Sequence, residues 1–245
     1  MKPFLFAMLL AAATGLQAAE IKVLSSNALK AVLEELAPQF EKNSGHTIKA
    51  QFAPAADLKA RIERREDFDI TILTAALMDD LAKMNHIVLK TRFDLAKVGA
   101  GVAIRKGAPK PDLSSGEGFK RSLLAAKSIA YVGTGATGAT MRKAFDRLGI
   151  AEEMKAKTRL LSGVSAAEAV AKGEAELGFS VVSEILGVAG AELAGPLPPE
   201  LQVYLVFPVA GSASAPDPRA GLQFLQFLKT PEAAKVIRAK GMEPG

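Results

Sequence analysis

The sequence has no cysteine and no tryptophan, and it contains only two histidines and two tyrosines. Without cysteine there is no disulfide framework and no thiolate nucleophile, so a hydrophobic core has to hold the fold together. Two histidines offer little for a zinc site, and neither a G-x-S-x-G elbow nor an H-E-x-x-H helix occurs. We therefore expect no metal, no cofactor and no enzymatic activity.

The sequence also lacks a concentrated cluster of charges of one sign. The formal net charge is only +5, and basic residues are mixed with acidic ones, as in Glu63-Arg64-Arg65-Glu66-Asp67. Nucleic-acid-binding chains usually carry a concentrated basic stripe with stacking aromatic residues. We expect no nucleic-acid partner, whereas a mildly positive field favours small anions.

Long hydrophobic runs are confined to the N-terminus. Lys2 precedes an apolar stretch, Phe4–Ala13, and Leu16–Ala19 offers small residues to a signal peptidase. No later segment reaches the roughly 18 uninterrupted apolar residues that span a bilayer, and the nearest, Leu177–Gly195, contains glutamates. We expect residues 1–19 to be a cleaved signal peptide and the mature protein to be periplasmic, with no membrane-spanning segment.

Strand and helix periodicities alternate along the rest of the chain, which is typical of an α/β protein with mainly parallel strands. Proline and glycine clusters at 107–112 and 195–199 indicate loops or junctions. The predicted strands are a short one from Ile21, then Ile48–Phe52, Phe68–Leu73, Val98–Arg105, Ser128–Val132, Thr158–Leu161, Leu177–Val181 and Gln202–Phe207. The predicted helices are Leu29–Phe40, Asp57–Arg65, Ala76–Met84, Gly118–Ala126, Ala139–Leu148, Ser165–Lys172 and two that open at Asp217-Pro218 and Thr230-Pro231.

Four strand-to-helix junctions are rich in small and hydroxyl residues. They are Ser25–Ala28, Ala53–Asp57, Gly133–Thr140 and Leu161–Ser165. Ligands bind at the carboxyl ends of strands in open α/β sheets, so these junctions are candidate site loops. The alternative is helix capping, by Ser26 or Asn27 in the first loop, by Asp57 in the second, and by a Ser165–Glu168 capping box in the fourth.

The third loop is the richest in glycine, and its glycines allow a close approach to a ligand at a helix N-terminus. It lacks the Gly-Lys-Ser/Thr ending of a P-loop, and no acidic partner for a ribose lies at a strand end about twenty residues on. We interpret it as an anion cradle in preference to a flexible turn. Arg142, one turn further, could add a bidentate contact to a carboxylate, as could Arg61; for either, a solvated helix face is the alternative.

Six stretches of the chain together resemble one family, and they cover the mature sequence from end to end. They are Val23–Leu29, Leu36–Phe40, Phe52–Leu58, Lys143–Gly149, Gly173–Phe179 and Phe227–Ala234. The chain resembles the periplasmic substrate-binding proteins of ABC importers, most closely their molybdate-binding family. The resemblance implies the type 2 periplasmic binding fold, with two α/β lobes, mixed but mainly parallel sheets flanked by helices, and two hinge crossovers.

The crossovers are expected near Lys97–Ala103 and Val203–Val209. The first lobe would then comprise residues 20–97 and 209–245, and the second lobe residues 98–208. The implied partners are a small anionic ligand, bound between the lobes, and a membrane permease. The protein is expected to be a monomer.

The family's oxyanion site takes hydroxyls from two serines and a tyrosine, and backbone N–H groups from the second lobe. The serine positions fall at Ala28 and Ala55, the tyrosine at Val181, and the backbone donors at Thr137 and Val164. Each missing hydroxyl would cost a desolvated oxyanion about 1–3 kcal/mol. The departures predict a larger anion, such as an organic carboxylate, in a roomier cleft. The predicted ligand-binding residues are Ser25, Ser26, Asn27, Ala28, Ala55, Thr137, Gly138, Arg142, Val164 and Val181.

Other functions remain open at this point. Molybdate or tungstate could be captured mainly through backbone N–H groups. An exported hydrolase on the same fold would need His46 or His86 beside a cleft serine. A two-lobed sensor that reports to a membrane kinase would close in the same way as a transport receptor.

Overall fold

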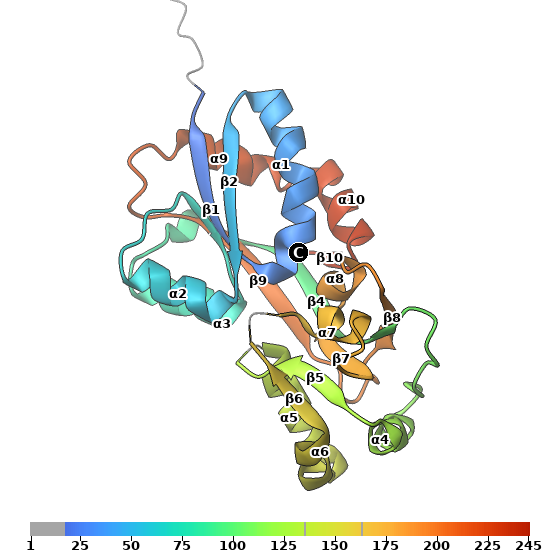
Figure 1. The fold of residues 1–245 in the computed structure, drawn as a ribbon. Coiled ribbons are helices and arrows are strands. Elements are labelled where there is room, and N and C mark those ends of the chain that lie inside the picture. Colours follow the sequence, from blue (N-terminus) through green and yellow to red (C-terminus); the bar gives the residue numbers. More distant parts are fainter. Residues whose placement is uncertain (1–17, 135, 163) are drawn as a thin grey trace, which may run out of the picture.

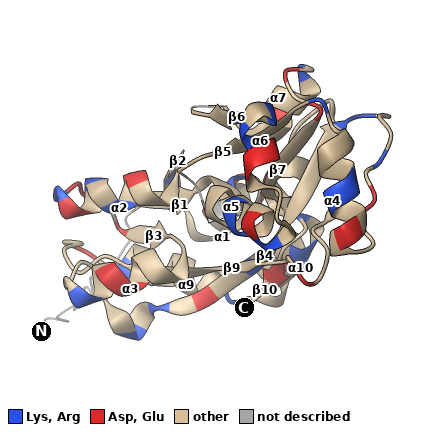
Figure 2. Cartoon of the chain, turned by 90° about the horizontal axis from the view of Figure 1, so that it is seen from below, with Lys and Arg blue, Asp and Glu red and all other residues tan. Residues whose placement is uncertain are grey.

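The computed structural model describes residues 18–134, 136–162 and 164–245, so nearly all of the predicted signal peptide lies outside the described residues. Two α/β lobes are joined by two long strands, as Figure 1 shows. Within the described residues, no helix combines the length and the apolar character needed to cross a membrane. Basic and acidic residues are interspersed along the helices in the view of Figure 2.

The elements follow the alternation that the periodicity predicts. The strands are β1 (Glu20–Ser26), β2 (Thr47–Ala53), β3 (Ile70–Ile72), β4 (Phe93–Arg105), β5 (Ile129–Val132), β6 (Thr158–Leu161), β7 (Leu177–Val181), β8 (Ala191–Pro196), β9 (Tyr204–Gly211) and β10 (Glu243–Pro244). The helices are η1 (Asn27–Leu29), α1 (Lys30–Ser44), α2 (Ala55–Glu63), α3 (Ala75–Lys83), η2 (Leu89–Thr91), α4 (Gly116–Ala125), α5 (Ala136–Leu148), α6 (Ala151–Lys157), α7 (Ala166–Ala171), α8 (Val182–Leu186), α9 (Arg219–Phe227) and α10 (Pro231–Ala239).

The strands form one continuous sheet in the order β2-β1-β3-β9-β4-β7-β5-β6, with β8 and β10 also paired to β4. Strands β1, β2 and β3 are mutually parallel, as are β5, β6 and β7. The crossover strands β4 and β9 pair antiparallel to each other and to β3 and β7. Each lobe is thus a parallel α/β layer, and the antiparallel pair runs between them, as expected for this fold class. The predicted lobe boundaries at 97/98 and 208/209 fall inside these two strands.

The two lobes have separate hydrophobic cores. The first core gathers the inner faces of β1, α1 and β9 and receives the C-terminal helices α9 and α10. Its aromatic centre places the rings of Phe40 and Phe224 5.0 Å apart, edge to face, with Phe227 5.6 Å from Phe40. The second core packs α4, α5 and α6 against β5 and β7, with Phe119 against Phe179 at 6.0 Å. Most of each core therefore lies within one lobe, whereas Val181 at the end of β7 belongs to the first core.

Some local expectations are wrong in detail. Pro218, not Asp217, is the N-cap of α9, and the Asp217 carboxylate instead accepts bonds from the backbone and guanidinium of Arg219. Asp57 does not cap α2 because the helix begins earlier, with Pro54 as its N-cap. Strand β8 and helix α8 were not predicted, because a long apolar run has the period of neither a strand nor a helix. By contrast, the side chain of Thr230 caps α10 with Pro231 at its first position, as predicted.

Candidate functional site

The four predicted loops all follow the carboxyl ends of parallel strands. In the first lobe, β1 and β2 end at Ser26 and Ala53, which are paired partners. In the second lobe, β5 and β6 end at Val132 and Leu161, which are also partners. The ends of β5 and β6 lie on the side of the second lobe that is turned toward α2 and α3 in Figure 1. The loops of both lobes are therefore directed toward the same interlobe region.

Ser26 presents a buried hydroxyl that bonds to no residue of the described part of the chain. Ser25 is fully buried, and its hydroxyl donates to the carbonyl of Ser26 at 3.2 Å. Ser26 is 7% exposed and occupies the N-cap of η1, but its side chain makes no capping bond and no hydrogen bond with any described residue. Every fully buried polar side-chain atom of the described chain has a partner, so the Ser26 oxygen must keep some access to solvent. The capping alternative for Ser26 therefore does not apply, and Asn27 beside it is exposed.

Ala28 and Val181 are buried in the first core, 3% and 4% exposed respectively. The Ala28 carbonyl accepts a hydrogen bond from the Ser183 hydroxyl of α8 at 2.9 Å. Protein fills the space at both positions, so their small side chains do not create the roomier cleft that the sequence predicts there. A ligand could meet only backbone groups at Ala28 and Val181, whereas Ala55 is partly exposed.

The N-terminus of α2 carries free backbone donors. The first N–H groups to bond back to the Pro54 carbonyl are those of Asp57 and Leu58, at 3.0 and 3.2 Å. The N–H groups of Ala55 and Ala56 come before these and have no acceptor within the helix. Since α2 has nine residues, its aligned peptide dipoles favour negative charge at this end.

The loop after β5 is shaped by close packing at Gly138. A Cβ at Gly138 would lie 2.5 Å from the carbonyl oxygen of Val132 and 2.7 Å from that of Gly133, so only glycine lets the first turn of α5 sit this close to the strand. Thr137 beside it is partly exposed. The Arg142 guanidinium donates to the Gly133 carbonyl at 3.0 Å and remains exposed. Arg142 is thus tied to the loop, with donors left over for a ligand.

The fourth loop holds the predicted capping box. The hydroxyl of Ser165 accepts from the N–H of Glu168, and the Glu168 carboxylate accepts from the N–H of Ser165. Ser165 therefore caps α7, and Val164 just before it is partly exposed. Arg61, the other candidate cation, is engaged with Glu66.

Both histidines lie near the amino ends of strands, at the end opposite to the candidate loops. His46 directly precedes β2, and its ring bonds the Ala19 N–H at 3.1 Å and the Gln223 side chain at 3.2 Å. A seven-residue strand at about 3.3 Å per residue puts this end roughly 20 Å from Ser26. The backbone of His86 is bonded to Ala213, next to the amino end of β3. Neither histidine can act as a base for a serine of the candidate loops.

Glu184 is not among the site residues predicted from the sequence, where it only interrupts an apolar run. It lies in the first turn of α8, and its carboxyl shares a hydrogen bond with the Ser180 hydroxyl of β7. Burial raises the pKa of this carboxyl, and the bond to Ser180 opposes that effect only in part. A glutamate among small apolar residues at a strand end is the signal that could have identified it.

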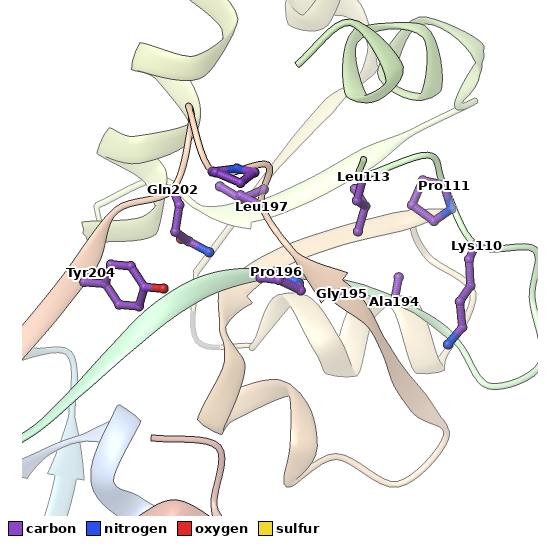
Figure 3. A pocket seen from close by; sticks show the side chains of 10 residues that line it. Lys110, Pro111, Leu113, Ala194, Gly195, Pro196, Leu197, Gln202 and Tyr204 are labelled. Atoms are coloured by element: carbon purple, nitrogen blue, oxygen red, sulfur yellow. The ribbon is translucent and has the colours of Figure 1, made fainter. Parts of the chain in front are cut away.

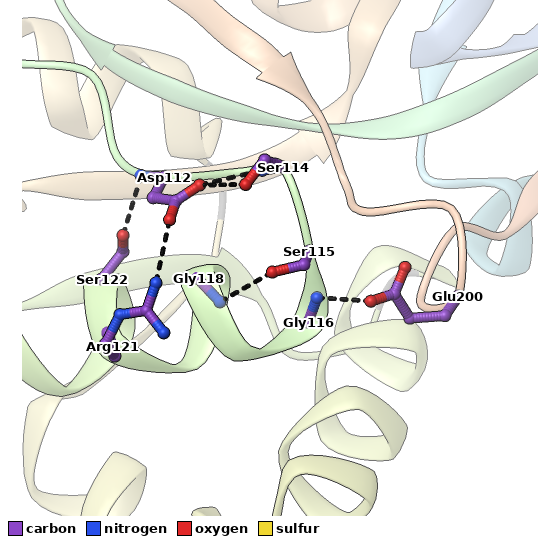
Figure 4. A network of polar contacts seen from close by, with 8 residues as sticks. All are labelled: Asp112, Ser114, Ser115, Gly116, Gly118, Arg121, Ser122 and Glu200. Atoms are coloured by element: carbon purple, nitrogen blue, oxygen red, sulfur yellow. Dashed lines mark hydrogen bonds and ion pairs between the residues drawn. The ribbon is translucent and has the colours of Figure 1, made fainter.

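A separate cavity of about 550 Å³ lies on the second lobe, lined by residues of 110–113 and 194–204 (Figure 3). None of the predicted site residues lines it. Polar bonds hold neighbouring segments: the Glu200 carboxylate accepts from the N–H of Gly116 at the start of α4, and Ser115 caps the same helix by accepting from the N–H of Gly118 (Figure 4). The Gln202 side chain bonds both backbone groups of Ala100 at 2.9 Å. The lining of this cavity is distinct from the four candidate loops.

No cluster of three or more metal-ligating side chains occurs among the described residues. The interlobe loops instead supply hydroxyl and backbone N–H donors.

Comparison with known proteins places the chain in a family. A family model described as bacterial extracellular solute-binding protein matches residues 21–243. An aconitate isomerase of Pseudomonas sp is 31% identical over 245 residues, covering 96% of this chain and 94% of its own. The molybdate-binding protein ModA of Azotobacter vinelandii is 31% identical over 237 residues, covering 92% and 90%.

Two solved structures share the fold. The periplasmic molybdate-binding protein of Azotobacter vinelandii has a TM-score of 0.76 at 22% identity, covering 92% of this chain and 99% of that one. The substrate-binding domain of a molybdenum ABC transporter from Clostridium difficile, described as putative, has a TM-score of 0.73 at 16% identity, covering 93% and 100%. With the family model matched over nearly the whole described chain, the protein belongs to the bacterial extracellular solute-binding proteins and is of the molybdate-binding-protein-like type.

Proposed function

We propose that the protein is a receptor that captures a small organic anion with several carboxylates between its lobes and delivers it to the membrane permease of an ABC importer. The unpartnered, nearly buried Ser26 hydroxyl carries this proposal. It stands at the carboxyl end of β1, beside free N–H groups of α2. An anion would give the hydroxyl and the N–H groups the acceptors that they lack.

The donor set favours an organic anion over molybdate. A tetrahedral oxyanion that lost three hydroxyl partners would be under-paired by about 1–3 kcal/mol for each of them. A carboxylate is planar and presents two oxygens, so two N–H groups, or a tethered guanidinium such as that of Arg142, can satisfy it. The relative named aconitate isomerase supports the same ligand class.

Calorimetric titration tests this proposal. The mature chain should bind trans-aconitate, cis-aconitate or citrate more tightly than molybdate or tungstate. Ser26→Ala should weaken the binding of the organic anion about 5- to 150-fold, because one buried donor is lost at about 1–3 kcal/mol. Ser122→Ala is the control and should bind as the wild type does, because Ser122 of α4 is partly exposed and its solvent-exposed bond goes to the Asp112 N–H. Submicromolar binding of molybdate without comparable binding of the organic anions would overturn the proposal.

Isomerisation of an aconitate-like anion is a second candidate function, which the relative's name favours. Moving a double bond along such a molecule requires a group that removes a proton from carbon and returns one. Both histidines are excluded by position, whereas Glu184 lies near the candidate loops. Proton NMR of cis-aconitate incubated with the protein tests this candidate. Formation of trans-aconitate would establish it, and an unchanged spectrum would leave the receptor function alone.

Transport is tested separately from binding. Deletion of the gene should abolish uptake of the bound anion by whole cells, and a Ser26→Ala copy should restore uptake less well than the wild-type copy. Undiminished uptake in the deletion strain would refute the transport role while leaving the binding result intact.

A further inference from the structure

Glu184 lies where the second lobe touches the first candidate loop. Helix α8 starts directly after β7, and Ser183, one residue before Glu184, donates to the Ala28 carbonyl of η1 at 2.9 Å. The N-cap of η1 is Ser26, the residue with the unpartnered hydroxyl. The first turn of α8 is therefore a close neighbour of the proposed ligand site.

The Glu184 side chain is directed away from the C-terminal segment. A Cβ built on Gly241 would lie within 2.8 Å of the side chains of Val182 and Leu186, so that face of α8 is turned toward the end of the chain. Residue 184 lies on the opposite side of the helix, since successive residues are about 100° apart. Its carboxyl meets the Ser180 hydroxyl at the carboxyl end of β7, and the residue keeps partial exposure.

No described cation neutralises this carboxyl. Strands β4, β7 and β8, together with η1 and α7, pack on α8. The segment at Gly241 also lies against it, and Lys240 in that segment pairs with Glu35. The charged residues of those strands, η1 and α7 are Asp94, Lys97, Arg105, Glu168 and Glu192. Lys97 pairs with Glu243 and Glu192 with Lys110, while Glu168 belongs to the α7 capping box. Arg105 lies against Gly173, and Asp94 lies beside Gly245 at the C-terminus. Only burial and the Ser180 bond act on the pKa of Glu184, and burial, which raises it, is the larger effect.

Building on the proposed function, we propose that Glu184, next to the Ser26 loop, determines the specificity of the anion site by donating a hydrogen bond from its protonated carboxyl to a carboxylate of the bound ligand. An acid–carboxylate bond is short and strong because one partner is charged. It would supply one donor in place of the hydroxyls missing at Ala28, Ala55 and Val181. Where Glu184 is ionised in the free protein, binding must take up a proton.

Proton linkage tests this role. Trans-aconitate is titrated calorimetrically into the mature chain between pH 6 and 9, where the ligand's carboxyl groups are ionised because their ordinary pKa values are near 4. Above the pKa of Glu184, wild-type affinity should fall by up to tenfold per pH unit. Glu184→Gln, which keeps a neutral donor, should bind with a nearly flat pH profile. The control, Glu174→Gln at an exposed carboxyl of the same lobe, should keep the wild-type slope.

A measurement on the wild type alone covers the case in which Glu184→Gln does not fold. The heat of binding at pH 8 in two buffers with different ionisation enthalpies counts the protons exchanged, and uptake of up to one proton is expected. A flat wild-type profile without proton uptake, or an equal slope in Glu184→Gln, would refute the role of Glu184 while the receptor function stands. Failure of the wild type to bind trans-aconitate, cis-aconitate and citrate at every pH would instead refute the proposed function, and the role of Glu184 with it.

Discussion

Removal of the Ser183 hydroxyl should destabilise the protein measurably, because that hydroxyl forms a buried link between α8 and η1. Ser183 is 3% exposed and donates to the Ala28 carbonyl at 2.9 Å. A buried neutral hydrogen bond contributes about 0.5–1.5 kcal/mol net, and alanine cannot replace the donor. For a chain of this size about 1 kcal/mol shifts Tm by roughly 2–4 °C. Ser183→Ala should therefore lower Tm by about 1–6 °C.

Thermal unfolding followed by circular dichroism, together with urea unfolding, measures this effect. The matched control is Ser122→Ala, which removes a hydroxyl of the same size whose bond to the Asp112 N–H is exposed to solvent. Water replaces that partner, so the control should unfold close to the wild type. If Ser183→Ala and Ser122→Ala unfold at the same temperature and urea concentration, the link between α8 and η1 does not contribute to stability and the reasoning is wrong.

Three further expectations concern packing and charge. Phe224→Ala should lower the free energy of unfolding in urea by about 3–5 kcal/mol, because the fully buried ring packs edge to face on Phe40. A decrease no larger than that of a typical surface substitution would contradict this packing. Gly138→Ala should lower the free energy of unfolding by about 1–3 kcal/mol and also weaken anion binding, because the new Cβ would lie 2.5 Å from the Val132 carbonyl oxygen. Unchanged stability and affinity would show that the loop can move aside. The unliganded wild type should lose stability as pH rises from the ordinary glutamate pKa through the raised pKa of Glu184, since the folded state then holds an unpaired buried charge. Glu184→Gln should remove this loss, and parallel Tm profiles of the two proteins between pH 4 and 9 would refute it.

The order of strands and helices could be predicted from the sequence because it depends on local periodicity. Thr158–Leu161 and Leu177–Val181 are strands with the predicted bounds, and Thr230 and Ser165 cap their helices as predicted. Residues 182–195 are mostly apolar with the period of neither a strand nor a helix, so α8 and β8 could not be predicted.

The α/β class, the family and the loops that could carry a site can be predicted from the sequence, because they follow from short-range pattern and from the order of motifs. The tertiary structure alone decided which residues of those loops are available to a ligand. Three close neighbours in sequence show this. The hydroxyl of Ser25 has a partner, that of Ser26 bonds to no described residue, and Ala28 belongs to the core. Burial and hydrogen bonding depend on partners far away in the sequence, as where Ser183 donates to the Ala28 carbonyl 155 residues away. The burial that raises the pKa of Glu184 likewise comes from the tertiary structure.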